Sequence, residues 1–429
     1  MRYGKTMTIV SLVLSVQHIG TGRRLGTPLA AALVVLLLLT THVVSPADLA
    51  SGVEVLWRPI LAITSIMLST NVAERLGILD YAARWIEPRS GQTVIRVFRS
   101  VFVFSAVIAA VLNNDAAILL LTPLIVGVIR RCYPRRPELV VPFAFAVFSA
   151  AGVAPLMISN PINLIVSEYA GIGFNEYAAR MIPIAVAGSV TSYLVLRMVF
   201  RRQLHAIPGL ETGSTFKPSM PILSQPAKIY LTTMVAALGC YPALSYVGGP
   251  VWVVAVGSAT FGVWLCRHYG IASAGQLAAP VPWEILIFLY CIFIIALGLR
   301  NVGLIDRITE FYSVNDSEAQ VFVIGIASAV GSALLNNHPM AILNSLAILN
   351  LPHSSHEQLM AALIGGDLGP RLLPIGSLAG LLWLNSLQML GVYIRPSQFV
   401  LVGLPVTIPA LGVSLIILLL GQPLQLLVK

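Results

Sequence analysis

Several side chains that could do chemistry lie inside long apolar stretches of this chain. An Asn-Asn-Asp run at residues 113–115 and an Asn-Asn-His run at residues 336–338 interrupt two such stretches, and Asp367 and Arg371 interrupt a third. An ionisable group at the centre of a bilayer costs roughly 2.5 to 3.5 kcal/mol or more, so each is a candidate functional residue. Carboxyl groups in such surroundings can carry protons, and amide groups can bind a polar solute.

The candidates for proton coupling are Asp115, Asp367 and Arg371. Burial favours the neutral form of a carboxyl group and a nearby arginine favours the charged form, so the balance can allow proton exchange near neutral pH. His338 offers a further titrating group, or it packs as a neutral ring beside Pro339. Two structural roles stay open: Asp115 as the cap of a helix, and Asp367 with Arg371 as a buried ion pair.

The candidate solute-binding residues all carry amide, hydroxyl or imidazole groups within the two runs or beside helix-breaking prolines and glycines. They are Asn113, Asn114, Ser159, Asn160, Asn163, Asn336, Asn337, His338 and Ser377. Breaks at residues 155–163 and 365–377 release backbone groups, which are tolerated at membrane depth only where they are buried in protein or line a cavity. We therefore expect a polar site near the midplane, with the N-termini of half-helices directed at it.

The composition places these residues in a membrane. Hydrophobic residues make up 57% of the 429 positions, charged residues make up 10%, and the mean hydropathy is +0.87. We expect an all-α, polytopic protein of about ten transmembrane helices of about 20 residues each, in contact with membrane lipid. Apart from the Asn-Asn stretches, the expected spans cover residues 28–44, 57–76, 140–170, 177–200, 229–246, 251–266, 283–299, 358–391 and 399–420.

Several function classes are excluded by the same pattern. The net charge of +9 comes from basic residues between apolar spans, which is typical of cytoplasmic loops and does not indicate a nucleic acid partner. The four cysteines, Cys132, Cys240, Cys266 and Cys291, have no metal-ligand spacing, so we expect no metal site and no cofactor. No nucleophile and base pair is apparent, and we therefore do not expect an enzyme.

Each Asn-Asn run is predicted to form the tip of a re-entrant helical hairpin. The first hairpin has apolar arms at 101–112 and 116–129, and such arms reach only about 20 Å at 1.5 Å per residue. Arginines precede the hairpin at 84–99 and follow it at 130–136, so both of its ends face the same, cytoplasmic side. The distribution of basic residues along the following loops then predicts a cytoplasmic N-terminus and a second hairpin that opens to the outside.

The two halves are predicted to be inverted repeats, each with a hairpin and a broken helix. Trp57 and Trp283 lie 226 positions apart, as do Asp80 and Asp306, while the two Asn-Asn pairs lie 223 positions apart. Five spans separate the starts of the copies, which inverts one copy relative to the other. We divide the chain into an N-terminal cytoplasmic or interfacial segment (1–26), a first repeat (27–205), a linker with a connecting helix (206–248) and a second repeat (249–429).

Longer motifs around the charged residues resemble a known family. Residues 111–117 read VLNNDAA and are followed by LTP at 121–123, and residues 366–371 read GDLGPR and are followed by PIGSLA at 374–379. These motifs resemble the arsenite efflux permeases, the ArsB-type proteins of the ion transporter superfamily. The resemblance covers residues 28–420 or so, and the family commonly has lysine where this chain has Arg371.

The resemblance implies efflux of arsenite and antimonite from the cytoplasm in exchange for protons, across a prokaryotic plasma (inner) membrane. It also implies an occasional partner, a cytoplasmic arsenite-stimulated ATPase. Arsenite is an uncharged trihydroxide at neutral pH, which suits amide, hydroxyl and carboxylate partners. The alternatives are a sodium/proton antiporter or sodium-coupled anion carrier of the same superfamily, and a passive metalloid channel.

Overall fold

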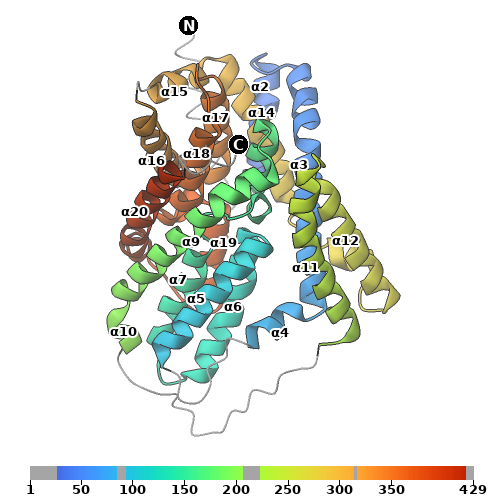
Figure 1. Cartoon of the computed structure of the whole chain (residues 1–429), viewed down its shortest axis with the longest axis vertical. Coiled ribbons are helices and arrows are strands. Elements are labelled where there is room, and N and C mark those ends of the chain that lie inside the picture. The colour runs from blue at the N-terminus through green and yellow to red at the C-terminus, as the bar shows by residue number, and fades with distance from the viewer. Residues whose placement is uncertain (1–26, 85–92, 206–222, 314–315, 422–429) are drawn as a thin grey trace.

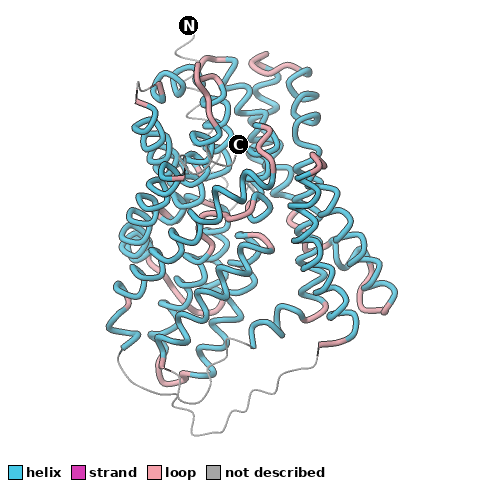
Figure 2. Tube along the Cα trace, viewed as in Figure 1, coloured by secondary structure: helices cyan, strands magenta, loops and turns pink. Residues whose placement is uncertain are grey.

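A computed structural model of the chain describes residues 27–84, 93–205, 223–313 and 316–421. The described residues form helices joined by short loops and contain no strand (Figure 2). Eight of these helices are long and apolar enough to cross a membrane, and shorter apolar helices lie between them. The expected all-α, polytopic membrane fold is confirmed. The predicted N-terminal segment, residues 1–26, lies outside the described residues, and its cytoplasmic or interfacial location stays a prediction.

The helices follow one another in two series. The first series consists of α2 (Thr27–Thr40), α3 (Pro46–Arg75), α4 (Ile78–Arg84), α5 (Val94–Val111), α6 (Asn114–Cys132), η1 (Pro137–Leu139), α7 (Val140–Ala150), η2 (Met157–Ser159), α8 (Pro161–Ala170), α9 (Phe174–Val199) and α10 (Arg201–His205). The second consists of α11 (Gln225–Tyr246), α12 (Val251–His268), α13 (Ala274–Ala278), α14 (Trp283–Asn301), α15 (Leu304–Tyr312), α16 (Ser317–Leu335), α17 (Asn337–Leu349), α18 (His356–Leu368), η3 (Gly369–Arg371), η4 (Pro374–Gly376), α19 (Leu378–Met389) and α20 (Pro396–Leu420).

The two Asn-Asn runs separate the arms of two helical hairpins. The α5–α6 hairpin lies in the lower half of Figure 1, and α16 and α17 lie in its upper half. The arms are longer than predicted: α5 has 18 residues, or about 27 Å, because it continues through Arg96 and Arg99 at its polar end. The apolar stretch alone therefore underestimates the helix, whose first turns extend past the hydrocarbon.

Two expected spans are broken in the middle. Residues 151–160 separate α7 from α8, and residues 369–377 separate α18 from α19. Prolines lie at both breaks, and most residues of the first break are buried, whereas the second break includes the exposed Ile375. Each hairpin is followed by a broken helix, in the order that the sequence predicts.

The short helices α4 and α15 occupy equivalent places in the two series. Gly77 precedes α4 with φ 72°, and Gly303 precedes α15 with φ 83°, a left-handed conformation that glycine adopts without strain. In Figure 1, α4 lies at the lower end of the molecule and α15 at the upper end. The two ends of the molecule differ in charge, since α10 at the lower end carries Arg201 and Arg202 whereas α15 at the upper end carries Asp306 and Glu310.

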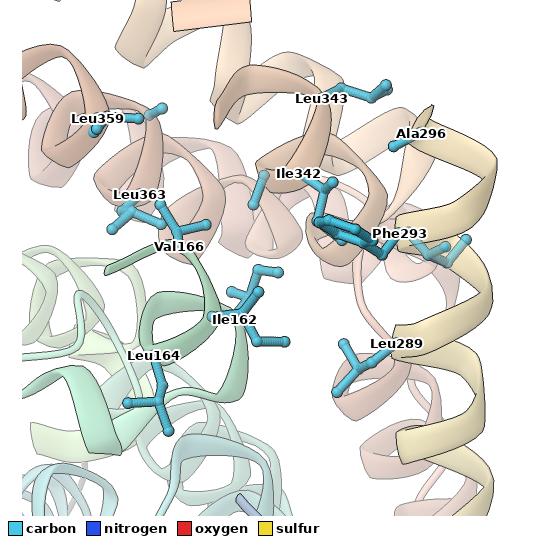
Figure 3. Close-up of a cluster of buried hydrophobic side chains, with 14 of the residues drawn as sticks. Ile162, Leu164, Val166, Leu289, Phe293, Ala296, Ile342, Leu343, Leu359 and Leu363 are labelled. Carbon is cyan, nitrogen blue, oxygen red and sulfur yellow. The ribbon is translucent and has the colours of Figure 1, made fainter. Parts of the chain in front are cut away.

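Apolar packing surrounds the broken helices. Helix α8 contributes Ile162 and Val166 to a buried cluster in which α14, α17 and α18 also take part (Figure 3). Around this unit, α2 packs on α14 and α3 packs on α12, while α9 packs on α20. The polar break between α7 and α8 is thus held inside a dense apolar shell.

Candidate functional site

Four helices begin inside the molecule, and each starts with a polar capping residue. These helices are α6, α8, α17 and α19, and their capping residues are Asn113, Asn160, Asn336 and Ser377. In each case the side-chain oxygen accepts a hydrogen bond from a backbone N–H two or three residues later, at 2.8 to 3.2 Å. The structure therefore assigns the capping role at the first tip to Asn113, and the alternative that Asp115 caps the helix is wrong.

Asp367 is the most completely surrounded of the charged candidates. Its carboxylate accepts hydrogen bonds from Asn160 Nδ2 at 2.8 Å, from Asn163 Nδ2 at 2.9 Å and from the Ala154 backbone N–H at 2.9 Å. Only 7% of the residue is exposed. Ala154 and Asn160 belong to the break between α7 and α8 and Asn163 belongs to the first turn of α8, so Asp367 lies at the positive N-terminal end of α8.

Arg371 binds the other side of the same break. Its Nη2 donates to the Ser149 carbonyl oxygen at 2.5 Å, and its Nη1 donates to Ser192 Oγ at 3.1 Å. Ser149 is in the last turn of α7, where a cation is favourable next to the free carbonyl groups. The described structure shows no direct salt bridge between Arg371 and Asp367, because each side chain hydrogen-bonds to a different helix end, although the two charges still attract one another.

The backbone of Arg371 fits against α20 with no space to spare. A Cβ atom added to Gly403 would overlap the Arg371 carbonyl oxygen, whereas one added to Gly412 on the same helix would meet nothing within 4 Å. We expect Gly403→Ala to lower the stability by about 1 to 3 kcal/mol through overpacking. Gly412→Ala is the matched control and should stabilise the helix by about 0.5 to 1 kcal/mol. Thermal unfolding in detergent measures both, and equal midpoints would contradict the prediction.

The first hairpin tip lies next to this break. Asn114 Nδ2 donates to the Gly152 carbonyl oxygen at 3.2 Å, and Ser159 Oγ donates to Ala110 on α5 at 2.5 Å. Asp115 is half-buried, and its carboxylate has no hydrogen-bond donor among the residues that the structure describes. The tip therefore contributes the carboxyl group of Asp115, next to Asn114, which bonds to the same 151–160 break that binds Asp367.

The second hairpin tip is more enclosed. Asn336 has φ 78°, and its Oδ1 also contacts His338 Nδ1 at 3.2 Å. His338 is 2% exposed and packs against Phe288 with 6.3 Å between ring centroids. Asn337 Oδ1 and His338 Nε2 are buried without a hydrogen-bond partner in the described part of the chain. Among the bonds of the described residues, none connects this tip with Asp367, so the second tip is less directly joined to the Asp367 site than the sequence predicts.

Sequence reasoning missed several polar groups of the site. Tyr177 accepts a hydrogen bond from Asn163 at 2.8 Å and donates to the Ala154 carbonyl oxygen at 3.0 Å. The sequence places Tyr177 only 14 residues after Asn163, near the start of the next span. An isolated tyrosine at the end of a span is usual at the membrane interface, so its type alone did not indicate a role in the site. The Ala154 N–H and the Ser149 carbonyl oxygen are backbone groups, for which the sequence gives no signal.

The cysteines do not form a thiol site. Cys132 and Cys240 are partly or fully exposed, and Cys266 and Cys291 are buried in apolar clusters. Within the described ranges, no group of three histidine, cysteine, aspartate or glutamate side chains is placed to hold a metal ion.

An ionic cluster joins the starts of α9 and α18. Arg180 contacts Glu357, and its other terminal nitrogen lies 3.4 Å from Glu176 Oε1, to which His356 Nδ1 also bonds at 2.7 Å. The side chains of Arg180 and Glu357 are 16% and 21% exposed, so the pair is largely withdrawn from solvent.

Because these charges are partly desolvated, we expect Glu357→Gln to lower the stability by about 1 to 3 kcal/mol. Glu310→Gln, on an exposed face of α15 where the ion pair is worth about 1 kcal/mol or less, is the control. The change in unfolding midpoint in detergent is the measurement. A loss at Glu310 as large as that at Glu357 would contradict the assignment of this cluster as a stabilising contact.

Comparisons with known proteins agree with this architecture. Residues 6–421 match the profile of the family described as arsenical pump membrane protein. The arsenical pump membrane protein of Escherichia coli K12 is 28% identical over 420 residues, and that of Yersinia enterocolitica is 26% identical over 418; each match covers at least 95% of both chains.

Solved structures of other transporters share the fold. The Alcanivorax borkumensis YdaH transporter has a TM-score of 0.61 at 14% identity, over 88% of both chains. Neisseria gonorrhoeae MtrF, whose title places it in a class of antimetabolite efflux pumps, has a TM-score of 0.55 at 11% identity, over 97% of this chain and 94% of that one. Because the family profile covers nearly the whole chain, this protein belongs to the arsenical pump membrane protein family.

Proposed function

We propose that the protein exports trivalent arsenite and antimonite from the cytoplasm in exchange for protons, by alternating access. Membership in the family supports an arsenic efflux transporter. The observation that carries the finer proposal is the buried Asp367 carboxylate, which accepts three hydrogen bonds from the α7–α8 break and the first turn of α8 and forms no salt bridge with any described residue. A carboxyl group in such a place is available to solute hydroxyl groups and to protons.

The two aspartates are proposed to differ in role. Protonation of Asp115 would break no hydrogen bond among the described residues, whereas protonation of Asp367 would disturb three that it accepts. We therefore assign the transported proton to Asp115 first and to Asp367 second. Arg371, held by Ser149 and Ser192, keeps a positive charge beside the site throughout the cycle.

The solute is proposed to bind to the unpaired polar atoms. Asn163 Oδ1 and Asn337 Oδ1 are buried acceptors without a partner in the described structure, and His338 Nε2 is a third such atom. A buried unpaired acceptor costs free energy, which a solute hydroxyl group would recover by donating to it. The capping oxygens of Asn113, Asn160, Asn336 and Ser377 are already used by backbone N–H groups, so these four residues chiefly shape the site.

The inverted arrangement of two repeats is proposed from the matching order of elements. A hairpin and a broken helix occur in each series, and the turns at Gly77 and Gly303 share one backbone conformation. The basic lower end and the acidic upper end in Figure 1 support a cytoplasmic lower end. Association with a cytoplasmic ATPase stays a prediction.

Transport in everted membrane vesicles tests the proposed function. When the vesicle interior is more acidic than the medium, arsenite is expected to accumulate inside above its concentration in the medium. A protonophore should abolish this accumulation. Equilibration without accumulation would select a passive channel, because a pore cannot move solute uphill. Dependence on sodium with no response to arsenite would select a sodium/proton antiporter or a sodium-coupled anion carrier. Antimonite in the same assay tests the second solute.

A further inference from the structure

A cavity of about 430 Å³ opens between α5 and α9 and reaches the first hairpin tip and the α7–α8 break at its inner end. Its walls include Val103 and Val107 from α5 and Val186 and Val190 from α9. These four side chains are 52% to 58% exposed. Exposed valines on membrane-spanning helices face lipid, so the cavity opens sideways into the bilayer.

The cavity runs from a basic mouth to the hairpin tip. Arg99 lies at one end, while Asn114 and Gly152 lie at the other. Arg99 is exposed and makes no ion pair with any described residue. The helix rises about 18 Å from Arg99 to Val111, and half of the hydrocarbon core is about 15 Å. With the tip near the midplane, Arg99 therefore lies at the depth of lipid headgroups.

The size and lining of the cavity do not suit the transported solute. A trihydroxide of arsenic has only four heavy atoms and needs hydrogen-bond partners on all sides, whereas nearly all the lining here is apolar. A long, apolar space with one cation at its mouth instead fits a hydrocarbon chain with an anionic headgroup.

We propose that this cavity binds an anionic phospholipid, with its phosphate at Arg99 and one acyl chain between α5 and α9. The chain's far end would contact the tip near Asn114, whose amide bonds to Gly152 beside the Asp367 site. The bound lipid thus fills the space beside the first hairpin and supports its position. The proposal does not depend on which solute the protein transports.

Native mass spectrometry of the purified full-length protein tests this site with phosphatidylglycerol and phosphatidylethanolamine offered in equal amounts. We expect the wild type to retain phosphatidylglycerol preferentially. Arg99→Gln should reduce that retention about fivefold, the size of one arginine contact with an anionic lipid. Arg96→Gln, exposed on the same helix but outside the cavity, is the matched control and should retain the wild-type level.

A second pair of variants tests the acyl chain. Val190→Trp should fill the cavity and reduce retention of both lipids, whereas Met198→Trp, which is exposed on the same helix outside the cavity, should not. Equal retention by the wild type, Arg99→Gln and Val190→Trp would overturn the proposal. Displacement of the lipid by millimolar inorganic phosphate would also overturn it, since that would indicate a simple anion site. Circular dichroism confirms that each variant is folded before its lipids are counted.

Discussion

Replacing Asp367 with asparagine is expected to lower proton-driven arsenite accumulation in everted vesicles by about tenfold or more, which corresponds to a loss of about 1.4 kcal/mol in the binding that couples solute to proton. The asparagine cannot exchange a proton, and its amide would face Asn160, Asn163 and the Ala154 N–H, which are all donors. Asp306→Asn on the exposed α15 is the control and should transport at the wild-type rate.

An exchange of the two side chains separates loss of the charge from loss of the fold. In Asp367→Asn with Asn163→Asp, a carboxylate and an amide again face one another across the break, because their atoms are 2.9 Å apart in the wild type. We expect the exchange to restore the unfolding midpoint and part of the transport. If Asp367→Asn alone retained full gradient-driven accumulation, the carboxyl group would have no part in the mechanism.

Replacing Arg371 is expected to have the second largest effect. Arg371→Gln removes the cation from the end of α7, leaves the Ser149 carbonyl oxygen buried without its donor, and should cost about 1 to 3 kcal/mol of stability. We also expect gradient-driven accumulation to fall by about tenfold, since about 1.4 kcal/mol of lost site stabilisation has that effect.

Arg371→Lys is the conservative comparison. It keeps the positive charge but cannot donate to Ser149 and Ser192 in the fixed geometry of a guanidinium group, so we expect intermediate transport. Vesicle accumulation and the unfolding midpoint, measured on the same preparations, distinguish charge from packing. Equal losses for the lysine and glutamine variants would mean that geometry, and not charge, is required at this position.

The elements of the fold were largely predictable because apolar stretches and helix breakers act locally. Residues 113–115 and 336–338 do form hairpin tips, and the prolines and glycines after each hairpin do break a helix. The length of α5 was not predictable from hydropathy, since its first turns carry Arg96 and Arg99 outside the apolar stretch. Helix ends of this kind depend on the depth of the interface and not on the residues alone.

The site was only partly predictable. The sequence identifies Asn160, Asn163 and Asp367 as polar groups in lipid, but it cannot pair residues that are more than 200 positions apart. It also predicts Asp115 as a possible cap, although Asn113 performs this role, because the choice depends on which residue has non-helical backbone angles. The hydrogen bond from Arg371 to the Ser149 carbonyl oxygen cannot be predicted from the sequence, because every residue has a backbone carbonyl group.

The placement of Asp367 and Arg371 at the two ends of one break has a mechanical consequence. Asp367 lies in the last turn of α18 and Arg371 in the connection that follows it, yet their partners lie in α7, in the α7–α8 break, in α8 and in α9. Hydrogen bonds of these two charged side chains therefore join the broken helices of the two series. A hinge between residues 27–205 and 249–429 would have to break these hydrogen bonds. We therefore expect the two broken helices to move together, as one unit, relative to α2, α3, α11 and α12 in the proposed transport cycle.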